Sequence, residues 1–172
     1  MSRTMPKLIP PRLLIIWHSR TGASAALARA AAAAARAAGD VDVQLRAASR
    51  VSAAELLTAS AYIFVGPENL ASMSGAMKEM VDRNYYALLD QVHGRPYALI
   101  IAAGSDGSGT VRQWQRIATG WRLKPIAEPL IICTHADAPE TIAARKILPQ
   151  DDLQRARDIG AAMAHGLAMG IF

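Results

Sequence analysis

Apolar residues in this chain gather in short runs separated by longer segments. The runs at 12–17, 61–66, 95–104 and 126–133 are almost wholly apolar, whereas 41–47 alternates apolar and polar residues with a period of two. Runs of this length and period are typical of β-strands. The pattern therefore predicts five strands, of which all but the second are buried on both faces.

The segments between these strands have the composition and spacing of helices. The segment 23–39 is rich in alanine, the strongest helix former, and Gly39 stands where a helix usually stops. Further helices with one apolar face are predicted at 74–89, 109–121 and 150–170. The segment 134–150 is the least patterned, and we expect it to form a surface connection.

Alternating strands and helices predict a parallel sheet covered by helices on both faces, because parallel neighbours need a crossover connection. In such sheets ligands bind beyond the carboxyl ends of the strands. Three loops, after the strands that end near Trp17, Gly66 and Ala103, are therefore the places to look for a site.

The first of these loops, "HSRTGAS", suits a small anion. Backbone N–H groups at the start of a helix have no partner and carry partial positive charge, Gly22 allows close approach, and Ser19, Thr21 and Ser24 offer hydroxyls. A phosphate monoester would fit, although a simple Ser/Thr cap with a glycine turn explains the same residues. The loop is neither a P-loop nor a dinucleotide fingerprint.

Two motifs resemble the flavodoxin-like superfamily. "SRTGAS" at 19–24 is similar to its phosphate loop, and "GPENLASMSGAMKEMVDR" at 66–83 is similar to the second loop and third helix of its NADPH-dependent FMN reductase and quinone reductase branches. The resemblance implies a three-layer α/β/α sandwich with a five-stranded parallel sheet in the order 2-1-3-4-5, and non-covalently bound FMN with NAD(P)H as a transient co-substrate.

The resemblance also assigns residues to the flavin. It assigns the FMN phosphate to Ser19, Arg20, Thr21, Gly22, Ala23 and Ser24, and the isoalloxazine ring to Pro67, Glu68, Asn69, Leu70, Ala71 and Ser72. The loop 103–109 is expected to close the other side of the ring, through Gly104, Ser105, Asp106 and Gly107. No catalytic side chain is assigned, since backbone N–H groups can stabilise reduced flavin without an acid or base. The second loop departs from the family because Asn69 and Leu70 replace an aromatic residue and Ala71 replaces a frequent glycine.

Several other side chains have two interpretations. His18 packs against the turn or faces the flavin. Trp114 and Trp121 belong to the core or an interface, or else cover a substrate. Tyr85 and Tyr86 are solvated, or reach the flavin of a second subunit in a homodimer.

Two possible roles of polar residues are weaker. Glu68 is either an exposed loop residue or a partner of flavin or nicotinamide. Cys133 and His135 lie two positions apart, but no further ligand residues cluster with them, so no metal site is predicted.

Composition limits the classes of function. With 172 residues, 52% of them hydrophobic, we expect one domain spanning 1–172. No apolar run is long enough to cross a bilayer. Pro10 and Pro11 interrupt the N-terminal apolar run, which argues against a signal peptide. The single cysteine, Cys133, fits a reducing, cytoplasmic location.

The chain is basic, with a formal net charge of +5 and a pI of about 9.8. Its lysines and arginines are scattered among acidic residues, which favours a solvated basic surface over a nucleic-acid partner. The leading hypothesis is an NAD(P)H-dependent FMN oxidoreductase that reduces a quinone, a flavin or a similar small electron acceptor. The alternatives are a flavodoxin-type electron carrier, against which the high pI counts, and a flavodoxin-like module that has lost FMN.

Overall fold

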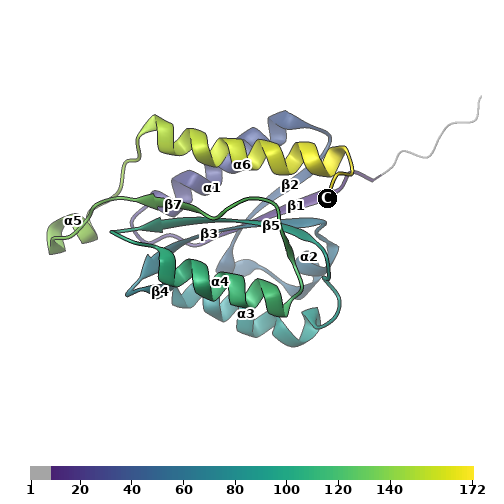
Figure 1. Ribbon diagram of the computed structural model, residues 1–172, viewed down its shortest axis with the longest axis horizontal. Helices are drawn as coiled ribbons and strands as arrows, with labels where there is room; N and C mark the ends of the chain where they lie inside the picture. The colour runs from purple at the N-terminus through teal and green to yellow at the C-terminus, as the bar shows by residue number, and fades with distance from the viewer. Residues whose placement is uncertain (1–8) are drawn as a thin grey trace, which may run out of the picture.

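The computed structural model describes residues 9–172, whose helices and strands form three layers (Figure 1). The strands are β1 (Arg12–Trp17), β2 (Asp42–Ala47), β3 (Ala61–Asn69), β4 (Ser72–Met73), β5 (Pro96–Ala103), β6 (Lys124–Pro125) and β7 (Leu130–Cys133). The helices are α1 (Ala23–Ala38), α2 (Ala53–Thr58), α3 (Gly75–Leu88), α4 (Ser108–Gly120), α5 (Pro139–Ala143) and α6 (Gln150–Ala168), and Ala48–Arg50 forms a 3-10 turn.

The sheet confirms the predicted fold class. Its main path runs β2-β1-β3-β5-β6, and every pair along it is parallel. The sheet has seven strands rather than five because β4 pairs antiparallel with the end of β3, and because β6 and β7 both pair with β5. Counted by position, β6 and β7 together form the fifth strand, and the order is the predicted 2-1-3-4-5.

Two strand boundaries differ from the prediction. The predicted strand 126–133 is regular only from Leu130, and a short strand precedes it at Lys124–Pro125. Pro125 and Pro129 have no N–H to donate to the ladder, which interrupts this edge strand. The strand predicted at 61–66 continues to Asn69 and turns back into β4.

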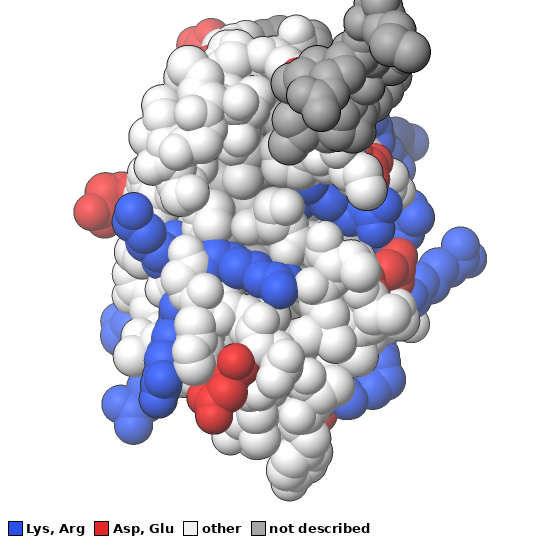
Figure 2. Space-filling model, turned by 90° about the vertical axis from the view of Figure 1, so that its right-hand side faces the viewer, with Lys and Arg blue, Asp and Glu red and all other residues white. Residues whose placement is uncertain are grey.

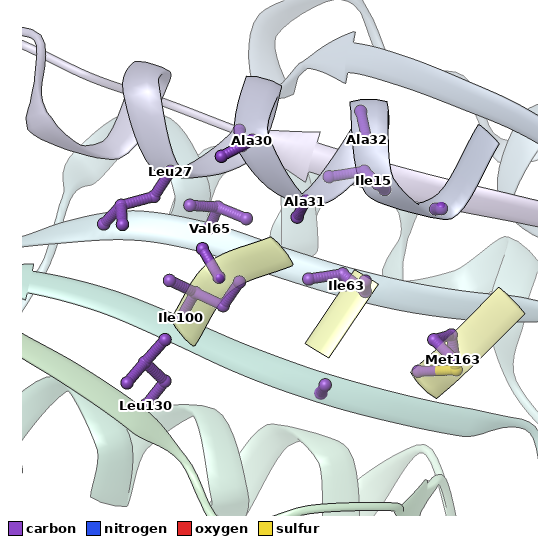
Figure 3. Close-up of a cluster of buried hydrophobic side chains, with 14 of the residues drawn as sticks. Ile15, Leu27, Ala30, Ala31, Ala32, Ile63, Val65, Ile100, Leu130 and Met163 are labelled. Carbon is purple, nitrogen blue, oxygen red and sulfur yellow. The ribbon is translucent and has the colours of Figure 1, made fainter. Parts of the chain in front are cut away.

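Helices cover both faces of the sheet. α1 and α6 lie on one face, and α2, α3 and α4 on the other (Figure 1). Figure 3 shows the first cluster, in which Leu27 and Ala31 of α1 and Met163 of α6 meet Ile63 and Ile100 of the sheet. The two helices approach closely, since a Cβ on Gly160 of α6 would lie 2.1 Å from the carbonyl oxygen of Ala31. The alanine-rich sequence of α1 therefore serves packing as well as helix formation.

The helices and the charged surface were also described by expectations from the sequence. Within residues 9–172, none of the helices combines the length and the apolar character needed to cross a membrane. The N-terminal apolar run was not expected to be a signal peptide, and residues 1–8 of that segment lie outside the described residues. Figure 2 views the end of the molecule at which the strands begin, and Lys and Arg side chains are spread over it among uncharged and acidic ones.

Candidate functional site

A cavity of about 690 Å³ lies beyond the carboxyl ends of β1, β3 and β5. Most of the residues assigned from the sequence to a flavin site line it, namely Ser19, Arg20, Thr21, Ala23, Ser24, Pro67, Glu68, Asn69, Leu70, Ala71, Gly104 and Ser105. Four assigned residues are not in its lining: Gly22, Ser72, Asp106 and Gly107. The structure therefore brings all three predicted loops to one cavity.

The loop between β1 and α1 forms one end of the cavity. Gly22 caps α1 with φ +99°, a left-handed conformation that favours glycine, and no side chain caps the helix. The first helical hydrogen bond runs from the N–H of Ala26 to the carbonyl of Gly22. The amides of Ala23, Ser24 and Ala25 therefore have no partner within the helix.

The hydroxyls of this loop differ in their surroundings. The Oγ of Ser19 accepts a hydrogen bond from the N–H of Gly22 at 3.1 Å, which stabilises the turn. The Oγ of Ser24 is buried and has no hydrogen-bond partner among the described residues. A buried hydroxyl without a partner costs free energy, and an anion at this end of the cavity would supply an acceptor.

The segment between β7 and α6 also forms part of the site, which the sequence did not predict. It contains α5, which projects beyond the sheet (Figure 1), and Thr134, Ala136, Ile142, Ala143 and Lys146 line the cavity. The N–H of Lys146 donates to the carbonyl of Thr21 at 2.7 Å, which fastens the segment to the loop between β1 and α1.

Lys146 also holds this segment in shape. Its Nζ donates to the carbonyls of Thr141, Ile142 and Ala144, at the end of α5. The segment has no periodicity, but it follows a strand that ends at the same edge as the other three. That topological rule is the signal that could have revealed its role.

The second predicted loop is a β-hairpin. Glu68 pairs with Met73 and Asn69 with Ser72, so Leu70 and Ala71 form a two-residue turn. Both residues have positive φ, 51° and 59°, which costs a non-glycine residue about 1 to 2 kcal/mol. Leu70 is fully exposed at the tip and lines the cavity. Strain of this kind persists only where surrounding contacts impose it.

Helix α4 imposes the conformation of the hairpin. The Oε1 of Gln113 accepts hydrogen bonds from the N–H of Met73 at 2.7 Å and the Oγ of Ser72 at 3.1 Å. Gly109 allows the closest approach, since a Cβ there would lie 2.1 Å from the carbonyl oxygen of Ala71. The hairpin is thereby fixed before any ligand binds.

Glu68 caps helix α4. Its carboxylate accepts from the N–H of Gly107 at 2.8 Å and from the N–H of Thr110 at 3.0 Å. These are orphan donors at the start of α4, where a negative charge is stabilised by the helix dipole. The structure therefore shows a role for Glu68 that was not considered: its carboxylate joins the hairpin to α4.

The third loop contributes two residues to the cavity, Gly104 and Ser105. Asp106 is exposed and accepts a hydrogen bond from the Oγ of Ser108, which lowers the pKa of the Asp106 carboxyl. Gly107 has φ +86° and its N–H is used by Glu68, so this residue shapes the loop.

His18 follows β1 and lies within hydrogen-bond distance, 2.8 Å, of the buried Oγ of Ser74 at the start of α3. Burial, and to a smaller extent the positive charge of Arg20, lowers the pKa of the His18 imidazole. His18 is not in the lining of the cavity. The side chain of His18 therefore packs against the start of α3.

Trp114 and Trp121 are buried in the core, and Trp114 stacks on Phe64 with ring centroids 4.3 Å apart. They therefore do not cover a substrate. Tyr85 and Tyr86 are exposed near the end of α3. Cys133 is half-buried, and residues 9–172 contain no cluster of three or more His, Cys, Asp or Glu side chains.

The cavity fits FMN at both ends. Unpartnered amides, a buried hydroxyl and the Arg20 side chain suit a phosphate monoester. The other lining residues include Pro67, Ala102 and Ala103, which are small or apolar and suit a flat ring. The volume also lies within the range of small-molecule sites.

Solved structures share this fold at low sequence identity. A flavodoxin from the domain Archaea is 18% identical with a TM-score of 0.74, over 91% of this chain and 98% of that one. A WrbA-like flavodoxin from Agrobacterium tumefaciens is 18% identical with a TM-score of 0.66, over 92% and 98% of the two chains. A flavodiiron core from Synechocystis is 14% identical with a TM-score of 0.75, but the 95% of this chain that matches covers only 37% of that protein.

The fold and the cavity thus define a flavodoxin-like protein, as the resemblance implied. A sequence profile of NADPH-dependent FMN reductases matches residues 46–137, more than half of the chain. The chain belongs to the NADPH-dependent FMN reductase family. Membership implies FMN as the cofactor and NADPH as a co-substrate, which confirms the expected cofactors. No curated protein sequence matches the chain.

Proposed function

We propose that the protein is an FMN-dependent oxidoreductase that takes a hydride from NADPH or NADH and reduces a small acceptor such as a quinone or free flavin. The observation that supports this most is the cavity. At the start of α1 it presents backbone amides and the Ser24 hydroxyl, which have no hydrogen-bond partner and suit an anion. Beside the fixed hairpin it has an apolar region that suits a flat ring. When bound, FMN supplies hydride acceptance and electron transfer.

The residues have separate roles in this proposal. Ser19–Ser24 hold the phosphate through backbone amides and the hydroxyls of Thr21 and Ser24. Residues 67–71 of the hairpin, with Gly104 and Ser105, hold the ring, and the segment 134–146 closes the phosphate end. The strained but fixed hairpin keeps backbone groups in place without reorganisation on binding, which favours affinity.

Three further expectations belong to the proposal. The chain acts as one domain spanning 1–172, and its single cysteine favours a cytoplasmic location. The exposed pair Tyr85 and Tyr86 on α3 suits contact with a second copy in a homodimer. Sedimentation of the purified protein tests the last point directly.

The first test is a titration with FMN followed by reaction with nicotinamides. We expect the protein to bind FMN, and the FMN-loaded protein to lose its flavin absorbance when NADPH or NADH is added anaerobically without a partner protein. A soluble quinone should restore the absorbance. Absence of heat on FMN titration would contradict flavin binding. FMN binding without bleaching by either nicotinamide would instead indicate an electron carrier.

A further inference from the structure

A second cavity, of about 570 Å³, adjoins the first across the tip of the hairpin. It lies between the hairpin, α3 and α4, and is lined by Ala71, Met73, Lys78, Gly109, Arg112, Gln113, Arg116 and Ile117. Ala71 lines both cavities, so the two adjoin at this residue of the hairpin turn. We call this second cavity the α4 groove.

The α4 groove is positively charged. Its lining holds Lys78, Arg112 and Arg116, and no carboxylate. Arg112 and Arg116 are four residues apart in α4, so they share a face, where like charges repel. Lys78 is paired with Asp82, whereas within residues 9–172 neither arginine has a carboxylate within ion-pair distance. Arg112 donates to the Oγ of Ser108 at 3.2 Å, and its charge adds to the Ser108 hydrogen bond in lowering the pKa of the Asp106 carboxyl. An anion between the two guanidinium groups would relieve this repulsion.

The groove has a rigid wall. The hydrogen bonds from Ser72 and Met73 to Gln113 hold β4 against α4, and β4 lies beside the start of that helix in Figure 1. Arg112 and Arg116 therefore project from a helix whose position relative to the flavin cavity is fixed. Guanidinium groups on such a frame suit phosphate, which they bind through two parallel hydrogen bonds.

The first cavity has its own cations, and they lie at the end away from the α4 groove. Arg20 and Lys146 line the phosphate end of the first cavity, by the start of α1, whereas the α4 groove meets that cavity at the hairpin. A ligand with a flat ring and its own phosphates, entering over the hairpin, would thus find a separate set of cations. A nicotinamide dinucleotide has this construction.

We infer that the α4 groove binds the phosphate groups of the nicotinamide dinucleotide through Arg112 and Arg116, while the nicotinamide lies in the first cavity. This inference rests on the proposed function, because it needs a nicotinamide to enter the first cavity. It goes beyond the proposed function by naming the two residues, Arg112 and Arg116, that determine the affinity for the dinucleotide. Either the 2′-phosphate of NADPH or the pyrophosphate common to NADPH and NADH supplies the anion.

The test compares the double variant Arg112→Gln/Arg116→Gln with wild type and with Arg157→Gln. Arg157 is a half-buried arginine of α6, on the opposite face of the sheet. The FMN-loaded proteins are titrated with NADP⁺ and NAD⁺ by calorimetry, and the Kd for FMN is measured separately. KM values for NADPH, NADH and reduced nicotinamide riboside complete the set.

We expect the double variant to bind NADP⁺ with a Kd at least about tenfold higher, which corresponds to about 1.4 kcal/mol. FMN affinity should stay unchanged, as should all values for Arg157→Gln. Weaker binding of NADP⁺ alone would identify the 2′-phosphate as the anion, and equal weakening of NADP⁺ and NAD⁺ the pyrophosphate. Reduced nicotinamide riboside, which carries no phosphate, should react equally well with wild type and variant.

Two results would overturn the inference, and they are distinguishable. If wild type binds NADP⁺ and is bleached by NADPH but the double variant does so with the same Kd and KM, the groove does not bind the dinucleotide and the proposed function stands. If FMN-loaded wild type neither binds NADP⁺ nor is bleached by either nicotinamide, both the inference and the proposed reductase function are wrong.

Discussion

Ser24 is the residue whose environment a ligand would change most. Its hydroxyl is buried at the start of α1 and has no hydrogen-bond partner among the described residues. A hydroxyl in that state contributes nothing to folding through hydrogen bonding and costs desolvation. Alanines flank it at positions 23, 25 and 26, so Ser24 is the one polar side chain in the first turn of α1.

We therefore predict opposite effects of Ser24→Ala on stability and on binding. The ligand-free variant should be as stable as wild type or more so, because no hydrogen bond is lost. Its Kd for FMN should rise about tenfold or more, because a hydrogen bond to a charged group contributes about 1.5 to 3 kcal/mol. Thermal unfolding and a fluorescence titration measure the two effects.

Ser60→Ala is the matched control for this prediction. The Oγ of Ser60 accepts a hydrogen bond from the N–H of Arg12 at 3.2 Å, at the opposite end of β1. This variant should lose stability and keep its affinity for FMN. A Ser24→Ala protein that is destabilised but binds FMN normally would place the phosphate elsewhere.

At the scale of elements, the β3–β4 hairpin depends on α4. Gly109 lets the turn lie against the helix, and Gln113 and Glu68 join the two through hydrogen bonds. The tip residues Leu70 and Ala71 keep a conformation that their side chains disfavour. The contacts with α4 offset this local cost.

We predict that Gly109→Ala displaces the hairpin. Its Cβ would lie 2.1 Å from the carbonyl oxygen of Ala71, and overpacking of this kind costs about 1 to 3 kcal/mol. FMN affinity should fall together with the free energy of unfolding. Gly120→Ala at the end of the same helix is the control, since a Cβ there meets nothing within 4 Å. That control should be neutral or stabilising, and equal behaviour of the two variants would contradict the prediction.

The elements also show what the sequence could and could not predict. Periodicity predicted β1, α1, α3, β5, α4 and α6 because their patterns are local. Helix α2 was not predicted, although the letters "SAAE" contain its capping box, formed by Ser52 and Glu55. The hairpin could not be predicted, because its turn has neither Asn nor Gly and is held by Gln113, about forty residues away.

The sequence also predicted one part of the candidate site and missed another. The sequence predicted that the loop between β1 and α1 would line the site, because a strand, a turn and a helix follow one another within a few residues. The role of Lys146 in the cavity was not predicted, because its N–H donates to the carbonyl of Thr21, which is far away in the sequence. The α4 groove combines Lys78 of α3 with Arg112 and Arg116 of α4, a juxtaposition that only the packing of two helices creates.

At the scale of the whole molecule, four connections meet at one edge of the sheet. Four connections line one cavity although they come from distant parts of the chain: the loop between β1 and α1, the hairpin, the loop before α4 and the segment 134–149. A ligand that contacts all four stabilises only the folded protein. By mass action, FMN at one hundred times its Kd should add about 2.7 kcal/mol to the free energy of unfolding.

We predict that this addition raises the Tm by roughly 5 to 10 °C for a chain of this size. Riboflavin, which lacks the phosphate, is the control at the same concentration and should raise the Tm much less, because the amides of α1 and the Ser24 hydroxyl would stay without an acceptor. Unfolding followed by circular dichroism measures both shifts. Equal shifts for FMN and riboflavin would mean that the loop Ser19–Ser24 does not hold the phosphate, even though the cavity binds the ring.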